Sequence, residues 1–181
     1  IIGNNNVKKC LKIIIESAQK RNDVVGHIFI SANYGQGKTT FAKAIANELK
    51  ADVLFANDRN FAKKKDALPY LMRMKRGSIL FIDEIHLIPK KIQTEIFLTL
   101  LEDFRLEIAK GCKSINFDKF TVIGATTDPA LILPPMRSRF IHNIQLEDYT
   151  IEELCQIIKI NCNKIGIDID DNALTNLAYR S

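Results

Sequence analysis

A glycine-rich stretch, SANYGQGKTT, begins at Ser31 and has the residue types that bind phosphate. From Ala32 to Thr39 it follows the pattern G-x-x-x-x-G-K-[ST], with alanine in place of the first glycine. Gly37, Lys38 and Thr39 complete the pattern. In such a loop backbone N–H groups surround a β-phosphate, the lysine reaches the β- and γ-phosphates, and the hydroxyl group holds Mg²⁺. A structural turn with a surface lysine has the same residues, so nucleotide binding needs a second signal.

Two acids provide that signal. In ILFIDEIH, four apolar residues precede Asp83 and Glu84, so both carboxylates follow a buried strand. Ligands of open α/β sheets bind at the carboxyl ends of the strands. There Asp83 is placed to hold Mg²⁺ through water, and Glu84 to orient and deprotonate an attacking water. Because burying an unpaired charge is costly, the two acids have little structural use. Loop and acids together favour nucleotide hydrolysis.

Further residue types add weaker signals. In the run that ends with GATT, Thr127 is a candidate sensor of the γ-phosphate, although threonine is common at strand ends. In PPMRSRF, Arg137 or Arg139 is a candidate arginine finger for a neighbouring subunit, whereas surface ion pairs are the usual role of such residues. His86 follows the acids without a second metal ligand, so a structural or sensing role is favoured over metal binding.

Composition indicates one globular domain, or one domain and part of a second. The chain has 181 residues, of which 46% are hydrophobic and 26% charged. No apolar run reaches the about 20 residues of a membrane span. The cysteines lack a C-x-x-C pair, which predicts a reducing, cytoplasmic location rather than a disulfide framework; they are Cys10, Cys112, Cys155 and Cys162. The net charge of +5 is weak support for a nucleic-acid partner.

Apolar strand candidates alternate with helical stripes along the chain. We expect a helix over roughly residues 4–21 and another that the phosphate loop opens. Five strand candidates begin at His27, Asp52, Ser78, Phe120 and His142. Such alternation is typical of an α/β protein whose parallel sheet carries helices on both faces. We therefore predict a P-loop NTPase fold with a five-stranded parallel sheet.

The pattern changes after Tyr149. A helical stripe follows from Ile151 to Cys162, and a second helix begins near Asp171. We predict a nucleotide-binding large subdomain over 1–149, followed over 150–181 by the start of a truncated, helical lid subdomain.

These motifs together resemble the AAA+ ATPases and, within them, the RuvB family of hexameric motors that drive Holliday-junction branch migration. The resemblance covers essentially the whole chain. FIDEIH, EDF and IGATT are its more specific parts, and RSRF and LEDY follow in the family's order. It implies ATP and Mg²⁺ as cofactors, four-way junction DNA as partner, a homo-oligomeric ring, and a role in DNA recombination and repair without a membrane.

The resemblance also implies roles for individual residues. ATP and Mg²⁺ would be bound by Gly35, Gln36, Gly37, Lys38, Thr39 and Thr40, with Ile2 and Gly3 near the adenine. Glu102, Asp103 and Phe104 match a triplet that the family uses around the nucleotide at the subunit interface. Arg139 rather than Arg137 aligns with the arginine finger, and Tyr149 with a nucleotide-contacting tyrosine.

The chain departs from the family at several places. Ala32, Asn33 and Tyr34 replace Gly-Pro-Pro; alanine is tolerated if its φ is negative, and Tyr34 can point outward. The segment 105–120 is shorter than the hairpin that docks the RuvA partner, which weakens the case for a RuvA-like partner. The sequence stops before the family's lid arginine and winged-helix domain, so we expect it to be either part of a longer protein or a divergent relative.

Three functions remain open from the sequence. The first is a motor whose ring converts ATP hydrolysis into DNA translocation. The second is a clamp-loader or RarA-like replication-repair ATPase, against which the EDF triplet and the spacing up to RSRF argue. The third is an ATP-gated adaptor with weak hydrolysis, favoured by the altered loop and shortened hairpin and opposed by Glu84 and Arg139.

Overall fold

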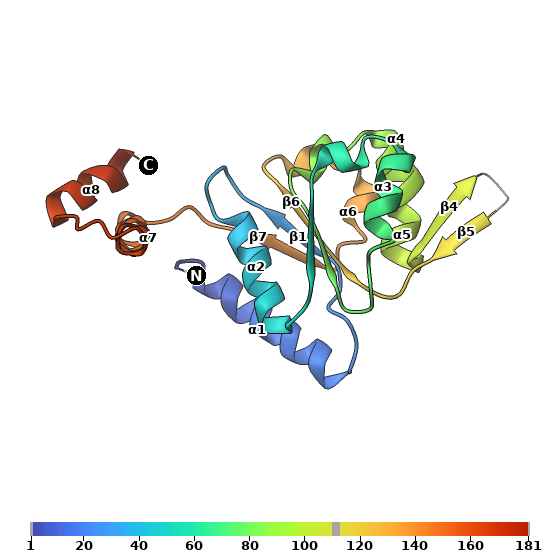
Figure 1. Cartoon of the computed structure of the whole chain (residues 1–181), viewed down its shortest axis with the longest axis horizontal. Coiled ribbons are helices and arrows are strands. Elements are labelled where there is room, and N and C mark those ends of the chain that lie inside the picture. The colour runs from blue at the N-terminus through green and yellow to red at the C-terminus, as the bar shows by residue number, and fades with distance from the viewer. Residues whose placement is uncertain (1, 110–112, 181) are drawn as a thin grey trace.

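The computed structural model of the chain describes residues 2–109 and 113–180 (Figure 1). A five-stranded parallel sheet forms its centre, in the order β2-β3-β6-β1-β7. The strands are β1 (Ile28–Ser31), β2 (Val53–Ala56), β3 (Ile79–Ile82), β6 (Thr121–Thr126) and β7 (His142–Gln145). All five lie where the apolar runs of the sequence predict them. The predicted α/β fold with a five-stranded parallel sheet is therefore confirmed.

Helices cover both faces of this sheet. The longer ones before the last strand are α1 (Asn5–Lys20), α2 (Lys38–Leu49) and α3 (Lys64–Leu71). A continuous helical stretch runs through α4 (Lys90–Ile92), the π-helical η3 (Gln93–Phe97) and α5 (Leu98–Asp103). Shorter pieces are η1 (Asp58–Phe61), η2 (Ile85–Leu87), η4 (Pro129–Leu131) and α6 (Pro134–Arg137).

Alternating side chains of the strands divide the core into two parts. Ile28 and Ile30 of β1 pack with α1 and α2, whereas Phe29 between them packs with the helices of the opposite face. This is the two-residue period of a strand that is buried on both sides. The central strands β3 and β6 are buried throughout. The core therefore holds the carboxyl ends of β1, β3 and β6 side by side.

A small antiparallel hairpin projects from the end of α5. It consists of β4 (Arg105–Ala109) and β5 (Lys113–Asn116), with an irregularity between Glu107 and Ala109. Phe104, at a φ of 52°, ends α5 and turns the chain into β4. From the sequence, the segment 105–120 was noted as shorter than the hairpin of the family. Cys112 lies outside the described residues.

Two helices follow the last strand. They are α7 (Ile151–Lys164) and α8 (Asp171–Arg180), which pack on each other through Leu174 and Ala178. A reciprocal cap between Thr150 and Glu153 starts α7, at the predicted residue. Figure 1 shows the pair set apart from the sheet, beyond an extended connector. The division into two subdomains at Thr150 stays a prediction. In the described ranges no helix is long and apolar enough to cross a membrane.

Candidate functional site

The phosphate loop joins β1 to the amino terminus of α2. Gly35 and Gly37 have φ values of 77° and 80°, in the left-handed region that favours glycine. A Cβ atom on Gly37 would also lie 2.8 Å from the Tyr149 hydroxyl oxygen. Ala32 has no positive φ, so the alanine fits its position as predicted. Tyr34 is 78% exposed, and the centre of its ring lies 5.4 Å from Nζ of Lys38.

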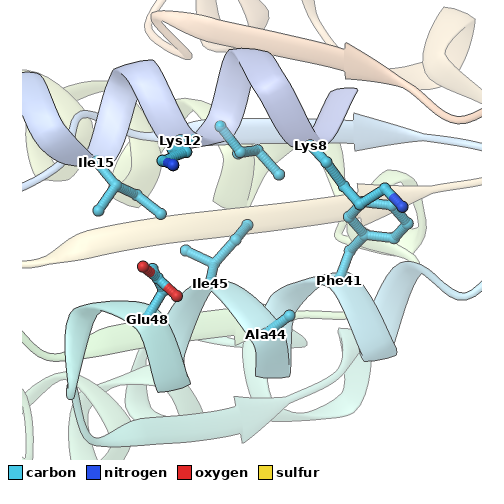
Figure 2. Close-up of a pocket in the computed structure, with 8 residues that line it drawn as sticks. Lys8, Lys12, Ile15, Phe41, Ala44, Ile45 and Glu48 are labelled. Carbon is cyan, nitrogen blue, oxygen red and sulfur yellow. The ribbon is translucent and has the colours of Figure 1, made fainter. Parts of the chain in front are cut away.

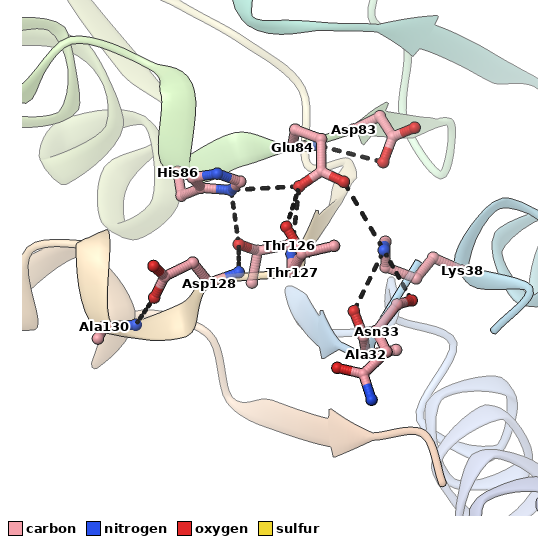
Figure 3. Close-up of polar contacts among 10 residues, drawn as sticks. All are labelled: Ala32, Asn33, Lys38, Asp83, Glu84, His86, Thr126, Thr127, Asp128 and Ala130. Carbon is pink, nitrogen blue, oxygen red and sulfur yellow. Dashed lines mark hydrogen bonds and ion pairs between the residues drawn. The ribbon is translucent and has the colours of Figure 1, made fainter. Parts of the chain in front are cut away.

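Lys38, which begins α2, lies inside this loop (Figure 3). Its Nζ donates hydrogen bonds to the carbonyl oxygens of Ala32, over 3.2 Å, and Asn33, over 3.3 Å. The same atom lies 3.7 Å from Oε1 of Glu84, and the residue is 8% exposed. A buried ammonium group held by neutral carbonyl oxygens and one carboxylate favours an anionic ligand.

The two acids follow β3 directly, as predicted. Glu84 has a φ of 44°, an uncommon conformation that turns its side chain toward the loop. Its Oε2 accepts hydrogen bonds from the backbone N–H of Thr127, over 3.1 Å, and from the Thr127 hydroxyl group, over 3.0 Å. Asp83 accepts a hydrogen bond from the Glu84 N–H and forms no ion pair within the described ranges. Its carboxylate therefore remains available to a cation.

The sheet order brings these residues together. Lys38 comes from the loop after β1, Glu84 from the end of β3 and Thr127 from the end of β6, and β6 lies between the other two strands. Parallel strands place their carboxyl ends at one edge, where ligands of such sheets bind. The predicted convergence of loop, acid and threonine is thus present. Figure 3 shows Glu84 between Lys38 and Thr127.

His86 and Thr126 also belong to this network, and the sequence did not assign them to it. His86 Nδ1 lies 3.2 Å from Glu84 Oε2 and 2.8 Å from Thr126 Oγ1. Thr126 is fully buried, and its Oγ1 accepts a hydrogen bond from the Asp128 N–H. In the sequence, the position of His86 three residues after Asp83 was the available signal for this contact. That signal favoured only a structural or sensing role for the histidine. Among the described residues no group of acids, histidines and cysteines could hold a metal ion by itself.

The amino terminus and the connector to α7 lie beside the phosphate loop. Tyr149 donates a hydrogen bond from its hydroxyl group to the Gln36 carbonyl oxygen, and its ring lies 3.0 Å from the place that a Cβ atom on Gly3 would take. Asn33 donates to a carboxylate oxygen of Asp148, over 3.1 Å. Ile2, the neighbour of Gly3, is half-buried. Tyr149 therefore lies next to the loop, with Gly3 beside its ring.

Arg139 and the EDF triplet lie elsewhere in the chain. The guanidinium group of Arg139 donates to Oε2 of Glu102, over 2.7 Å, and to the carbonyl oxygens of Leu98 and Pro135. Phe104 packs on the rings of His27 and Phe120. These contacts hold Arg139, Glu102 and Phe104 with α5 and the sheet, so none of them is placed at its own phosphate loop. Asp103, the last residue of α5, is exposed.

The residues of the loop fit a nucleotide phosphate with a divalent cation. The amino terminus of the 12-residue α2 supplies N–H groups, and Thr39 and Thr40 lie in its first turn. The Gln36 side-chain oxygen is buried without a hydrogen-bond partner among the described residues. Lys38 supplies a positive charge, while Thr39 and Asp83 supply the oxygen ligands that Mg²⁺ prefers.

Away from the phosphate loop, a hollow lies between α1 and α2 (Figure 2). Its walls are apolar side chains of the two helices, among them Ile15, Phe41 and Ile45, with Lys12 and Glu48 at the rim. No residue from 32 to 39 lines it. This hollow is therefore separate from the phosphate loop.

Comparison with known proteins agrees with this geometry. Residues 1–146 match the family model described as the Holliday junction DNA helicase RuvB P-loop domain. The chain is 39% identical to the Holliday junction branch migration complex subunit RuvB of Rhodopirellula baltica, covering 100% of this chain and 51% of that protein. It is 41% identical to the same subunit of Kosmotoga olearia, covering 99% and 54%. The chain thus spans about half the length of these relatives.

Solved structures give the same result. The Thermotoga maritima RuvB Holliday junction branch migration motor superposes with a TM-score of 0.88 at 37% identity, covering 99% of this chain and 57% of that one. A point mutant of the same protein has a TM-score of 0.89 at 35% identity, covering 100% and 58%. By sequence and by structure, this chain belongs to the RuvB family of P-loop AAA+ proteins.

Proposed function

We propose that the chain is the ATP-binding and ATP-hydrolysing part of a DNA motor subunit that acts on four-way junctions in recombination and repair. One observation carries the proposal: Glu84 lies between Lys38 and Thr127, at the edge of the sheet where β1 ends and the phosphate loop begins. A base, a cation and a hydroxyl group at a phosphate loop are the groups that phosphoryl transfer to water requires. The junction substrate is proposed from the names of the relatives.

The loop residues bind and orient the triphosphate. The N–H groups from Gly35 to Thr40 surround the phosphates, and Lys38 exchanges its two carbonyl partners for phosphate oxygens. Thr39 and Asp83 would hold Mg²⁺, which supplies positive charge to the phosphates when bound. Gly3 and Tyr149, with Ile2, form the side of the site toward the base of the nucleotide.

Glu84 acts as general base for the attacking water. Its carboxylate takes a proton from the water while the water attacks the γ-phosphate in line with the bond that breaks. Thr127 donates to the γ-phosphate and positions it, and Lys38 offsets the developing charge. In the structure both oxygens of Glu84 have partners, so these contacts must rearrange before the carboxylate can accept a proton.

Arg139 completes the site of a neighbouring subunit. Since it is held with α5, away from its own phosphate loop, a role in catalysis requires a second copy of the chain. Such a head-to-tail contact repeats and closes into a ring, which we propose to be a hexamer in the cytoplasm. Glu102, Asp103 and Phe104 would lie at that contact with Arg139.

A second candidate is an ATP-gated adaptor that hydrolyses slowly. It is favoured by the same engagement of Glu84, whose Oε2 accepts two hydrogen bonds from Thr127. An adaptor would keep this arrangement with ATP bound, whereas a motor must release it.

Steady-state ATP hydrolysis by the full-length protein, with and without four-way junction DNA, tests the proposal. The Glu84→Gln variant is the matched control, because it keeps the shape of the side chain and removes the base. A motor hydrolyses ATP faster with the junction, and the variant binds ATP with at least roughly 100-fold lower turnover. Tight ATP binding without turnover on any DNA would instead identify the adaptor.

A further inference from the structure

The contact between His86 and Glu84 has no role in the mechanism above. His86 Nδ1 lies 3.2 Å from Glu84 Oε2, and the histidine side chain is 8% exposed. An ionised carboxylate can only accept hydrogen bonds, so a contact of this length requires the proton on Nδ1. The single Nδ1–H group is shared between Thr126 Oγ1, 2.8 Å from Nδ1, and Glu84 Oε2, 3.2 Å from Nδ1, the oxygen that also accepts from Thr127 (Figure 3).

Thr126 fixes the orientation of the histidine ring. Its Oγ1 lies 2.8 Å from His86 Nδ1 and accepts a second hydrogen bond from the Asp128 N–H, over 3.0 Å. Thr126 is 0% exposed and is the last residue of β6, where it pairs with Ser31 of β1. The ring is thus tied to the middle of the sheet rather than to a surface loop. An orientation fixed in this way suits a group that must hold another side chain.

The other partners of Glu84 change when phosphate binds. Lys38 and the Thr127 hydroxyl group turn to the γ-phosphate in the proposed mechanism, so their contacts with Glu84 are given up, whereas the backbone N–H of Thr127 keeps its hydrogen bond to Oε2. His86 faces neither the loop nor a candidate metal ligand in the contacts described, so its 3.2 Å contact with Oε2 persists. A carboxylate held at Oε2 presents Oε1, the oxygen now near Lys38, toward the phosphate loop.

We propose that His86 is a positioning residue for ATP hydrolysis: its Nδ1–H group, together with the backbone N–H of Thr127, holds Oε2 of Glu84 so that Oε1 faces the attacking water. The inference rests on the proposed function, because it requires Glu84 to be the base. It assigns to Thr126 the task of holding His86. The two adjacent threonines then have different roles: Thr126 orients His86, and Thr127 binds the γ-phosphate.

Four variants of the full-length protein test this role. His86→Leu removes the donor and keeps most of the volume, whereas His86→Asn keeps an N–H group near the position of Nδ1. Glu84→Gln, alone and combined with His86→Leu, shows whether the histidine acts through the glutamate. His142→Leu controls for the loss of a histidine on the sheet away from the site. The readouts are kcat and KM for ATP, and the Kd of a fluorescent ATP analogue.

We expect His86→Leu to lower kcat by roughly tenfold or more, with KM and Kd within about twofold, because a hydrogen bond to a charged group is lost only at the base. His86→Asn should restore most of kcat, and His86→Leu should cost nothing further in the Glu84→Gln protein. Equal losses in the Leu and Asn variants, or a Kd that rises as much as kcat falls, would overturn the positioning role.

The outcome also separates this inference from the proposed function. If the parent hydrolyses ATP, Glu84→Gln abolishes turnover and His86→Leu changes nothing, only the role of His86 fails. If the parent itself has no turnover under any DNA, both proposals fail together.

Discussion

The hydroxyl group of Tyr149 donates a hydrogen bond to the carbonyl oxygen of Gln36 over 3.2 Å, and so joins the connector before α7 to the phosphate loop. Burial raises the pKa of Tyr149, and the negative charge of Glu153 raises it further. The group therefore keeps its proton, and remains a donor, across the physiological pH range.

Removing this hydroxyl group should loosen the loop. We expect Tyr149→Phe to raise the Kd for ATP by about fivefold, because a neutral hydrogen bond is worth about 1 kcal/mol. Titration with a fluorescent ATP analogue measures the change. Tyr179→Phe is the matched control, since Tyr179 is 72% exposed on α8. An unchanged Kd in the Tyr149 variant would show that the loop keeps its shape without the contact.

Arg139 should matter only in assembled protein. We expect Arg139→Ala to lower ATP turnover by roughly 1,000-fold at concentrations where subunits associate, as loss of an arginine finger does. Below the association range, parent and variant should be equally slow. Turnover measured against protein concentration, beside sedimentation, makes the comparison.

Arg137→Ala serves as the control for that experiment. Its guanidinium group lies 5.4 Å from the centre of the Phe29 ring, so the change affects packing rather than a neighbouring site. A concentration-independent loss in the Arg139 variant would contradict a role between subunits.

Stability should fall when the protein is acidified, because of His27. Burial lowers the pKa of His27 to about 4, from 6.5 in the unfolded chain, although a hydrogen bond to the Leu101 backbone raises it slightly. Its Nδ1 accepts a hydrogen bond from the Val122 N–H, which a protonated ring cannot do. Between pH 6.5 and 4 the unfolded chain binds the proton and the folded chain does not. The stabilisation is complete above pH 6.5 and is lost as pH falls toward 4, by about 3 kcal/mol.

Urea unfolding across this pH range measures the effect. The pKa of His142 is also lowered, by burial and by the charge of Arg21, so His142→Gln is needed as a parallel variant. The parent and the His142 variant should both lose stability on acidification, whereas His27→Gln should lose less between pH 6.5 and 4. Parallel slopes for all three proteins would rule out His27 as the source.

Asn33 stands at the middle position of the loop segment for which the family resemblance implies Gly-Pro-Pro. Its side chain donates to Asp148, and proline has no such group. We expect Asn33→Ala and Asp148→Ala to expose the connector to limited proteolysis to the same degree, and the double variant to add nothing. Additive effects would mean that the two side chains act separately. Addition of ATP should reduce cleavage in the parent.

The sequence was sufficient to predict the fold and the centre of the site. The five strands are short apolar runs, and three of them are followed by the lysine loop, by the acids and by Thr127. Because parallel strands end at one edge, Lys38, Glu84 and Thr127 had to lie near one another. The positive φ of Gly35 and Gly37 likewise follows from their place in the loop.

The remaining contacts of the site depend on geometry that no spacing encodes. Thr126 and Thr127 are adjacent at the end of β6, and the structure is needed to show that Thr126 meets His86 and Thr127 meets Glu84. The pair of Arg139 and Glu102 joins residues 37 positions apart, one in the turn after α6 and the other in α5. Roles carried over for Glu102, Asp103 and Phe104 concern a neighbouring subunit and stay predictions.

The strand that leads into the phosphate loop has both of its neighbours far along the chain. His27, beside β1, bonds to Val122 of β6 across 95 positions, and Ser31 bonds to Ile144 of β7 across 113. At about 5–20 residues per second, a ribosome needs roughly 6 to 20 seconds to make that intervening length. During this time the glycines of the phosphate loop have been made, but β6 and β7, the two strands that pair with β1, have not. The nucleotide-binding edge is therefore finished late in synthesis, and ATP can assist only the last steps of folding.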